Sequence, residues 1–445
     1  MPSDSPHSLP PDPGLPTVTP PSGSMFFRLF GVPALLVGGV VLLLIVGQSL
    51  IGKFFRGSVS PEQVLRDLDN PNKEIRGRAA NDLVQVLLRD DDLASNSAFA
   101  LQLAHRLCRT RDSSAAFEKF HAEQFAKLSP KDKDRELPKL DPDRDYILLL
   151  SQCLSRFMVP VGAPALEEMA VQESGLDPLA LNARRRQALW ALANLGENVK
   201  RFDKLAPEQQ DAVASQLEIA AASGGEQAAA AKAALNHLVR RRQGRPDALG
   251  MDRVVEKCAE AEDPSLRELA AYVVNFWSGT AAQNARMEKV LVRLSHDTGK
   301  GEDELLKLEE QKPPETDSLL NRFVEKEQTQ SLVKKPGFRV QVNAAIALAR
   351  HGWKIRLTLL QTMLDEDELQ SIFVVQSKKS GAEQADQAAV VETMLNTLKA
   401  VAELHRQSPQ LDLSSLQPNL DKLAHNPNPA VQTEAGRVVR ALSKP

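Results

Sequence analysis

The segment NARRRQALWALANLGE, residues 182–197, decides the expected fold of this chain. Its apolar and small residues recur at positions i, i+3, i+4 and i+7, the spacing of an amphipathic helix. The same spacing recurs in DNPNKEIRGRAANDLVQVL at 69–87, GEQAAAAKAALNHLVRR at 225–241, EDPSLRELAAYVVNF at 262–276, RVQVNAAIALARHG at 339–352 and NPNPAVQTEAGRVVRAL at 426–442. Several of these segments follow a turn that contains Pro or Asp. The sequence therefore predicts that one type of amphipathic helix recurs along the chain.

The distances between these segments indicate a repeat. The steps are 111, 43, 37, 74 and 91 residues between the equivalent positions Ile75, Arg186, Ala229, Leu266, Val340 and Val431. They approximate one, two or three units of roughly 40 residues, the length of a repeated helix pair. One helix pair cannot bury its apolar stripe alone, so neighbouring pairs must stack. We expect the all-α class, with an α-solenoid of helix pairs over residues 60–445.

Composition agrees with this expectation and excludes other classes. The 445 residues include 55 Lys and Arg against 58 Asp and Glu, a net charge of −3, which excludes the strongly basic balance of a dedicated nucleic-acid binder. Aromatic residues make up only 4% of the chain, too few for a typical β-sandwich or barrel core. The three cysteines, Cys108, Cys153 and Cys258, are far apart, so they form neither a disulfide framework nor a CxxC metal site.

The repeated segments resemble HEAT repeats of the armadillo-like α-solenoid superfamily. The resemblance rests on the Asp/Asn-Pro turn, the apolar-Arg pair that follows it, and the subsequent alanines, as in Ile75-Arg76 with Ala79 and Ala80, and Leu266-Arg267 with Ala270 and Ala271. Gly196 and Gly352 suit the residue just after a helix end. Gln341 and Gln432 depart from the pattern, because the family often has Arg there. The resemblance implies a curved superhelix whose concave face binds unknown partner proteins.

Three polar stretches interrupt the pattern. Residues 110–145 include SPKDKDRELPKLDPDRD, whose Lys, Asp and Pro cannot bury a helix face, so we expect an exposed loop. Residues 298–335 begin with the similar TGKGEDELLKLEEQKPPETDS, and we expect a second polar insertion there, with a short helix at 302–311. Residues 376–387 predict a long loop between helices.

The N-terminal region predicts a disordered tail and a membrane anchor. Residues 1–24 contain eight prolines and almost no apolar side chains, so we expect a disordered, Pro-rich tail. Residues 29–52 are uncharged, and as a helix they would reach about 36 Å, enough to span the hydrocarbon core of a membrane. We expect a single transmembrane helix at 29–52. The alternatives are a cleaved signal peptide or a start of translation at Met25.

Flanking charges indicate the orientation of this anchor. Arg28 precedes the apolar stretch, whereas Lys53, Arg56 and Arg66 follow it. Because positive charges remain preferentially on the cytoplasmic side, we expect a single-pass membrane protein with a cytoplasmic solenoid. A solenoid on the outer side is the alternative.

Two basic clusters are the candidate contacts for an anion or a partner: Arg184, Arg185, Arg186, Arg240, Arg241 and Arg242. On one ridge they would bind anionic lipid or an acidic protein. The alternative is that they are solvated repeat edges, where helix C-termini favour cations. Lys334, Lys335 and Arg339 form a third, smaller cluster with the same two interpretations. Nucleic acid is the less favoured partner because the membrane tether favours anionic lipid or an acidic protein.

Catalytic motifs are incomplete, so no catalytic, cofactor or metal residue is assigned. His121 and Glu123 form an HxE without a later PCxxC, and SLVK at 331–334 lacks the partners of an SxxK nucleophile. The tryptophans Trp190, Trp277 and Trp353 are expected to be buried among the helices.

These features together predict a membrane-tethered HEAT-repeat scaffold or adaptor that binds other proteins, has no catalysis of its own and needs no cofactor. The alternative is a tethered enzyme, or a solenoid that binds nucleic acid or anionic lipid through its Arg clusters.

Overall fold

The computed structural model describes residues 60–127, 129, 144–173, 178–245, 247–301, 329–377 and 381–443. The predicted tail at 1–24 and the predicted transmembrane helix at 29–52 lie outside these residues. None of the described helices is long and apolar enough to cross a membrane. The chain divides into residues 1–64, described only from Ser60, and residues 65–445, to which the following paragraphs refer.

The described chain is mostly helical, as predicted. Its elements in chain order are α3 (Pro61–Leu68), α4 (Lys73–Leu87), α5 (Asp91–Ser95), α6 (Ser97–Ala126), α8 (Arg144–Leu154), η3 (Pro160–Gly162), α9 (Ala163–Ala170), α10 (Pro178–Phe202), α11 (Pro207–Ala222), α12 (Glu226–Arg242), α13 (Met251–Cys258), α14 (Pro264–Val274), α15 (Ala281–Leu294), β1 (Thr329–Val333), α17 (Phe338–Arg350), α18 (Leu357–Met363), α19 (Glu366–Ile372), β2 (Phe373–Ser377), β3 (Glu383–Ala385), α20 (Gln387–Gln407), η5 (Ser414–Leu416), α21 (Gln417–Leu423) and α22 (Pro429–Leu442).

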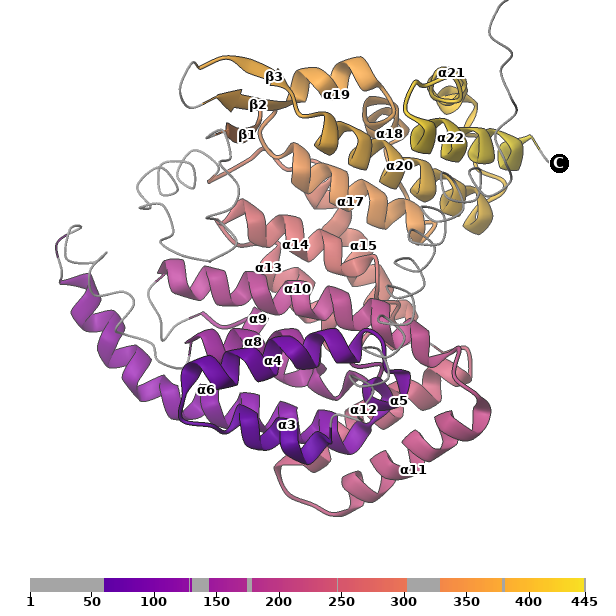
Figure 1. Cartoon of the computed structure of the whole chain (residues 1–445). Helices are drawn as coiled ribbons and strands as arrows, with labels where there is room; N and C mark the ends of the chain where they lie inside the picture. The colour runs from indigo at the N-terminus through magenta and orange to yellow at the C-terminus, as the bar shows by residue number, and fades with distance from the viewer. Residues whose placement is uncertain are drawn as a thin grey trace, which may run out of the picture. The chain divides into compact units, whose positions relative to one another are not determined.

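One layer of helices runs through residues 65–445, and we call it the ladder. In the ladder each helix packs on the next, in the order α4, α8, α10, α14, α17, α20 and α22 (Figure 1). A second set of helices packs against it: α6 on α8, α9 on α10, α13 on α14, α15 on α17, α18 on α20 and α21 on α22. This stacking of helix pairs agrees with the predicted solenoid.

Local sequence explains where the ladder helices begin. The side chains of Asn72, Asp263 and Asn428 accept hydrogen bonds from main-chain N–H groups in the first turns of α4, α14 and α22. Each cap satisfies an N–H that would otherwise have no partner. These are the Asp and Asn residues of the predicted turns. Gly352 follows the end of α17 with a φ of +66°, as expected for its position.

Alanines and one glycine bring the ladder helices close together. Ala188, Ala270 and Ala344 are completely buried, on α10, α14 and α17. Gly196 was predicted to end its helix, but α10 continues to Phe202. The reason is packing: a Cβ at Gly196 would lie 2.6 Å from Nε1 of Trp277, so the missing side chain makes room for the indole.

The prediction of an exposed loop at 110–145 is wrong for its first half. Helix α6 continues to Ala126, and Glu118 within it is buried. The Pro-rich, charged composition begins only at Ser129, whereas residues 110–126 contain no Pro or Gly to end a helix. Residues 130–143 lie outside the described part of the chain.

Two of the predicted polar loops contain strands. Strand β1 pairs antiparallel with β2, from Thr329 opposite Ser377 to Val333 opposite Phe373, and β2 pairs antiparallel with β3. The prediction of a loop at 376–387 is therefore wrong for the residues of β2 and β3, and the polar insertion predicted at 298–335 contains β1. The helical fold thus has a small sheet added to it. The pairing was hidden because β1 and β2 are about forty residues apart and very short.

The segment at 225–241 was predicted as a repeat unit, but it takes a different place. It forms α12, which packs mainly on α11 and also contacts α6, while α10 packs directly on α14. The α11–α12 hairpin therefore lies beside the ladder. Its helical periodicity is the same as that of a ladder helix, so spacing alone could not distinguish the two.

A buried arginine joins two turns next to the ladder. Arg267 of α14 donates to both carboxylate oxygens of Asp297, at 2.6 and 3.1 Å. It also donates to main-chain carbonyls at 2.8–2.9 Å, those of Ala261, Glu262 and Lys300. Both members of this ion pair are less than 10% exposed. Arg267 thus holds the turn before α14 against the residues after α15.

We predict that Arg267→Ala lowers the free energy of unfolding by about 3–5 kcal/mol, because a buried carboxylate and three carbonyls lose their donor. Arg293→Ala is the matched control, since Arg293 meets Glu260 at 3.6 Å and both are more than half exposed. Its loss should stay below about 1 kcal/mol. Urea unfolding of the full chain, followed by tryptophan fluorescence, measures both. Equal losses would contradict this assignment.

A buried carboxylate connects α9 to the start of α13. Glu167 accepts a hydrogen bond from the main-chain N–H of Gly250 at 3.1 Å. Burial raises the pKa of Glu167 to about 7, against the opposing effects of that hydrogen bond and of Arg253. Gly250 leaves room for this carboxylate, because a Cβ at residue 250 would lie 2.2 Å from Glu167 Oε2.

This shift predicts the direction of a pH dependence. Because the pKa is higher in the folded than in the unfolded chain, protonated Glu167 favours folding below its ordinary pKa of 4.5, and that stability is lost as pH rises through about 7. Glu167→Gln should therefore raise the free energy of unfolding at about pH 8, by on the order of 3 kcal/mol, and change it little at about pH 4. Urea unfolding at both pH values tests this; an equal effect at both would contradict it.

Candidate functional site

The first predicted cluster, Arg184 to Arg186, is used inside the fold. Arg184 is 3% exposed and forms an ion pair with the equally buried Glu118 of α6. Arg185 donates to the main-chain carbonyl of Ala170 at 2.9 Å. Arg186 meets the buried carboxylate of Asp263 at 2.7 Å. These arginines tie α10 to α6, α9 and α14.

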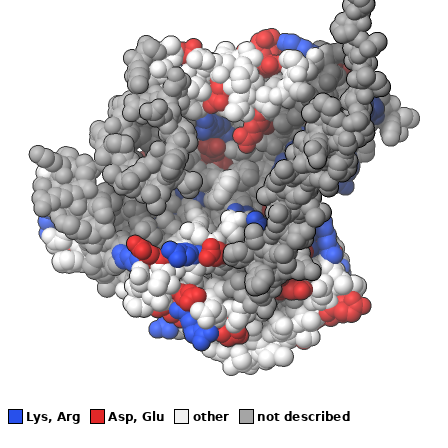
Figure 2. All heavy atoms as spheres, in the orientation of Figure 1, with Lys and Arg blue, Asp and Glu red and all other residues white. Residues whose placement is uncertain are grey.

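The second cluster, Arg240 to Arg242, connects the end of α12 to α11 and to the turns on either side of the α11–α12 hairpin. Arg241 pairs with Asp203 at 2.6 Å and Arg242 pairs with Asp211 at 2.7 Å. Arg240 lies 3.4 Å from Asp247 and is half exposed. Each guanidinium therefore faces a carboxylate. Acidic and basic side chains also alternate on the described surface that Figure 2 shows.

The three tryptophans occupy different environments. Trp277 is 2% exposed, as predicted, and its Nε1–H donates to the carbonyl of Leu192 at 3.0 Å. Trp353 is half-buried and stacks on His351. The prediction of burial is wrong for Trp190, which is 47% exposed. Trp190 lies in line with Asn194 and Glu197 on the solvent side of α10, so its position in the repeat belongs to the polar stripe.

Trp190 is part of a continuous aromatic surface, which we call the aromatic face: Trp190, Tyr272 and Phe276. The rings of Trp190 and Tyr272 stack across α10 and α14, with centroids 5.5 Å apart and planes 11° from parallel. Tyr272 meets Phe276 edge to face at 5.1 Å. Lys200 Nζ lies 5.2 Å from the centre of the Phe276 ring. These contacts hold an exposed indole in one orientation.

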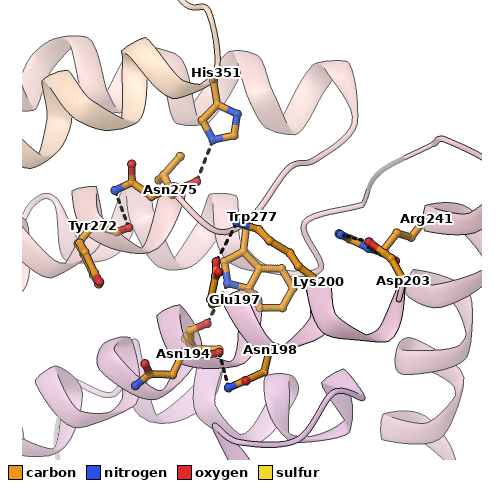
Figure 3. A network of polar contacts seen from close by, with 12 residues as sticks. Asn194, Glu197, Asn198, Lys200, Asp203, Arg241, Tyr272, Asn275, Trp277 and His351 are labelled. Atoms are coloured by element: carbon orange, nitrogen blue, oxygen red, sulfur yellow. Dashed lines mark hydrogen bonds and ion pairs between the residues drawn. The ribbon is translucent and has the colours of Figure 1, made fainter. Parts of the chain in front are cut away.

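A network of short polar contacts fixes the helix ends behind the aromatic face (Figure 3). Asn275 donates to the Tyr272 carbonyl at 2.9 Å. His351 Nε2 lies 2.8 Å from the Val274 carbonyl, and because a carbonyl only accepts, this nitrogen carries the proton. Burial lowers the pKa of His351, which favours that neutral form. The aromatic face is thus supported by satisfied main-chain groups.

Charged groups next to the aromatic face come from three helices. Glu197 is paired with Lys200 at 3.0 Å. Arg350, at the end of α17, is half-buried, and its loss of hydration lowers its pKa despite the opposing effects of the Tyr272 hydroxyl and of the carboxylates of Glu197 and Glu403. Burial raises the pKa of Tyr272, which keeps its hydroxyl neutral. Sequence reasoning missed Tyr272 and Arg350, because their proximity depends on ladder packing.

The ladder is hollowed at α20. A depression of about 590 Å³ is lined by Gln387, Ala388, Val391, Glu392, Leu395, Asn396, Lys399 and Asn428. Val391 and Leu395 are only half-buried there, so the depression presents apolar surface between polar groups. Glu392 in its wall is one of the carboxylates that, in addition to burial, raise the pKa of Tyr272.

The residues of the incomplete SxxK motif have other partners. Ser331 donates to Asp386 at 2.8 Å, and Lys334 forms an ion pair with Glu383, both at the small sheet. Among the described residues, no group of three His, Cys, Asp or Glu side chains is placed to hold a metal ion.

Comparisons with known proteins add little. No known family model matches the chain, and no curated protein matches it. A solved structure from work on a phosphorylation switch that controls the interaction between cadherin and beta-catenin is similar at a TM-score of 0.22, with 14% identity over 87% of each chain. A crystal structure of an engineered protein is similar at a TM-score of 0.15, with 15% identity over 86% of this chain and 99% of that one. Both scores are too low to support an argument.

We predict opposite roles for two tryptophans. Trp277→Ala should lower the free energy of unfolding by about 3–5 kcal/mol, because it empties a buried site and removes the indole hydrogen bond to the Leu192 carbonyl. Trp190→Ala should cost only about 1 kcal/mol, the value of an exposed stack. Circular dichroism during urea unfolding measures both without depending on indole fluorescence. A larger loss for Trp190→Ala would show that this side chain is structural.

Proposed function

We propose that this protein is a membrane-tethered scaffold of HEAT-like helix pairs that binds partner proteins through the ladder. The stacked helix pairs support the repeat assignment, and the uncharged stretch 29–52 supports the tether. Lys53 and Arg56 after that stretch support a cytoplasmic ladder.

The exposed stack of Trp190 on Tyr272 is the observation on which the binding proposal rests. About half of the Trp190 side chain is exposed to water. A polar residue would suit this solvent-facing position at least as well if Trp190 had only a structural role. Trp and Tyr contribute much of the binding free energy of protein interfaces, because each buries a large accessible surface area against the partner and loses little side-chain entropy. The aromatic face, fixed in advance by packing, suits a partner that covers it.

The alternative of a nucleic-acid or anionic-lipid binder is less well supported. Its proposed contacts, the two Arg clusters, each face a carboxylate or a main-chain carbonyl. A phosphate would have to replace these interactions and would gain little. We therefore place the binding surface on the aromatic face and not on Arg184 to Arg186 or Arg240 to Arg242.

The proposal predicts which labelled proteins depend on the aromatic face. An ATP-dependent biotin ligase is fused after Pro445 of the full chain and expressed in the native cell. The double variant Trp190→Ala, Tyr272→Ala should lose a defined set of labelled proteins, because two hot-spot side chains together account for about tenfold or more in affinity. Ile219→Ala is the control, since Ile219 is an apolar side chain, 71% exposed, on α11 away from the ladder.

Two outcomes would contradict the proposal. An unchanged set of labelled proteins in the double variant would remove the aromatic face as the binding surface. An absence of labelling from a well-expressed fusion would place the ladder on the side of the membrane without ATP.

A further inference from the structure

Arg350 has an environment unlike that of the clustered arginines. It is the last residue of α17 and half-buried, yet its guanidinium makes no hydrogen bond or ion pair with any residue in the described part of the chain. Arg184, Arg186 and Arg241, by contrast, each contact a carboxylate. A guanidinium carries five N–H donors, and burying it without acceptors costs free energy.

The nearest carboxylates do not neutralise Arg350 by contact. Glu197 and Glu403 interact with it only through space. Glu197 is already paired with Lys200 at 3.0 Å, and Glu403 accepts from Arg406 Nε at 2.9 Å and from Gln407 at 2.9 Å. Each of these carboxylates thus has its own cation, and the positive charge of Arg350 remains without a partner.

The aromatic face lies beside this cation. His351, the residue after Arg350, lies with its Nε2 2.8 Å from the carbonyl of Val274 at the end of α14, and Tyr272 is two residues before Val274. Trp190 stacks on Tyr272. A ligand that reaches Arg350 would therefore meet ring surface from α10 and α14.

We infer that Arg350 is the anion contact of this surface, and that its occupant is a partner-protein segment with an Asp or Glu carboxylate beside an aromatic or aliphatic side chain. This inference rests on the proposed function. A carboxylate fits the planar fork of a guanidinium with two parallel hydrogen bonds. Because Glu197 and Glu403 are already paired with Lys200 and Arg406, Arg350 adds one unpaired positive charge, which suits a single carboxylate better than a polyphosphate.

The test is selection of peptides from a displayed random library by the full chain in detergent micelles. Wild type, Arg350→Met, Arg350→Lys, Trp190→Ala and Arg242→Gln are compared. Arg350→Met retains the aliphatic stem and removes the charge, and Arg350→Lys restores the charge without the fork. Arg242→Gln is the matched control, because Arg242 is an exposed arginine that already pairs with Asp211. Circular dichroism during urea unfolding verifies that each variant is folded.

We expect wild type and Arg242→Gln to enrich peptides with an acidic residue at a fixed spacing from an aromatic or aliphatic residue. Arg350→Met should bind the selected peptides about tenfold to a hundredfold more weakly, and Arg350→Lys should recover part of that loss. Replacing the acidic residue of the peptide by its amide should weaken wild type but not Arg350→Met.

Other outcomes separate the two proposals. Enrichment of apolar peptides without an acidic residue, lost in Trp190→Ala and unchanged in Arg350→Met, overturns the role of Arg350 and leaves the proposed function standing. Absence of enrichment by any folded variant overturns both. Binding of phosphatidylserine vesicles or of single-stranded RNA that disappears in Arg350→Met, without peptide enrichment, overturns the inference in favour of a phosphate ligand.

Discussion

Trp277 extends from the end of α14 onto α10, where its Nε1–H donates to the Leu192 carbonyl at 3.0 Å. This contact requires Gly196, since any side chain there would occupy the space of the indole. It also explains how α10 and α14 can be neighbours although the α11–α12 hairpin lies between them in the chain. Because Trp190 and Tyr272 belong to these same two helices, their stack depends on this joint.

In the described part of the chain, several arginines have their acceptors inside the protein. Buried guanidinium groups with several acceptors join distant segments, as Arg267 joins the turn before α14 to the residues after α15. Removing one partner of such an ion pair lowers the free energy of unfolding by much more than the intact pair adds to it, because the other charge stays buried without a partner. Basic residues of the helix hairpin similarly meet acidic residues from neighbouring turns. Arg350 differs from these arginines, because it is half-buried and no carboxylate in the described part of the chain contacts it.

The sequence was sufficient to predict helices but not their neighbours. Segments 182–197, 262–276 and 339–352 are ladder helices as expected, since periodicity, caps such as Asp263 and the left-handed Gly352 are local properties. Segment 225–241 has the same periodicity and still lies beside the ladder, because its place is decided by packing on α6 and α11. The β1–β2 pairing likewise joins residues far apart in the chain.

The candidate site was likewise only partly predictable: a local sequence signal exists for Trp190 but not for Arg350. The position of Trp190 in line with Asn194 and Glu197 on α10 is a sequence signal of exposure, because these polar residues lie on the solvent side of the helix. Nothing local distinguishes Arg350 from other arginines at a helix end, where the dipole favours a cation. Its distinctive property is that the packing of α14, α17 and α20 takes it partly out of water, while the nearby carboxylates have other partners. Arg350 is thus available to a partner carboxylate because Glu197 and Glu403 are already paired with Lys200 and Arg406.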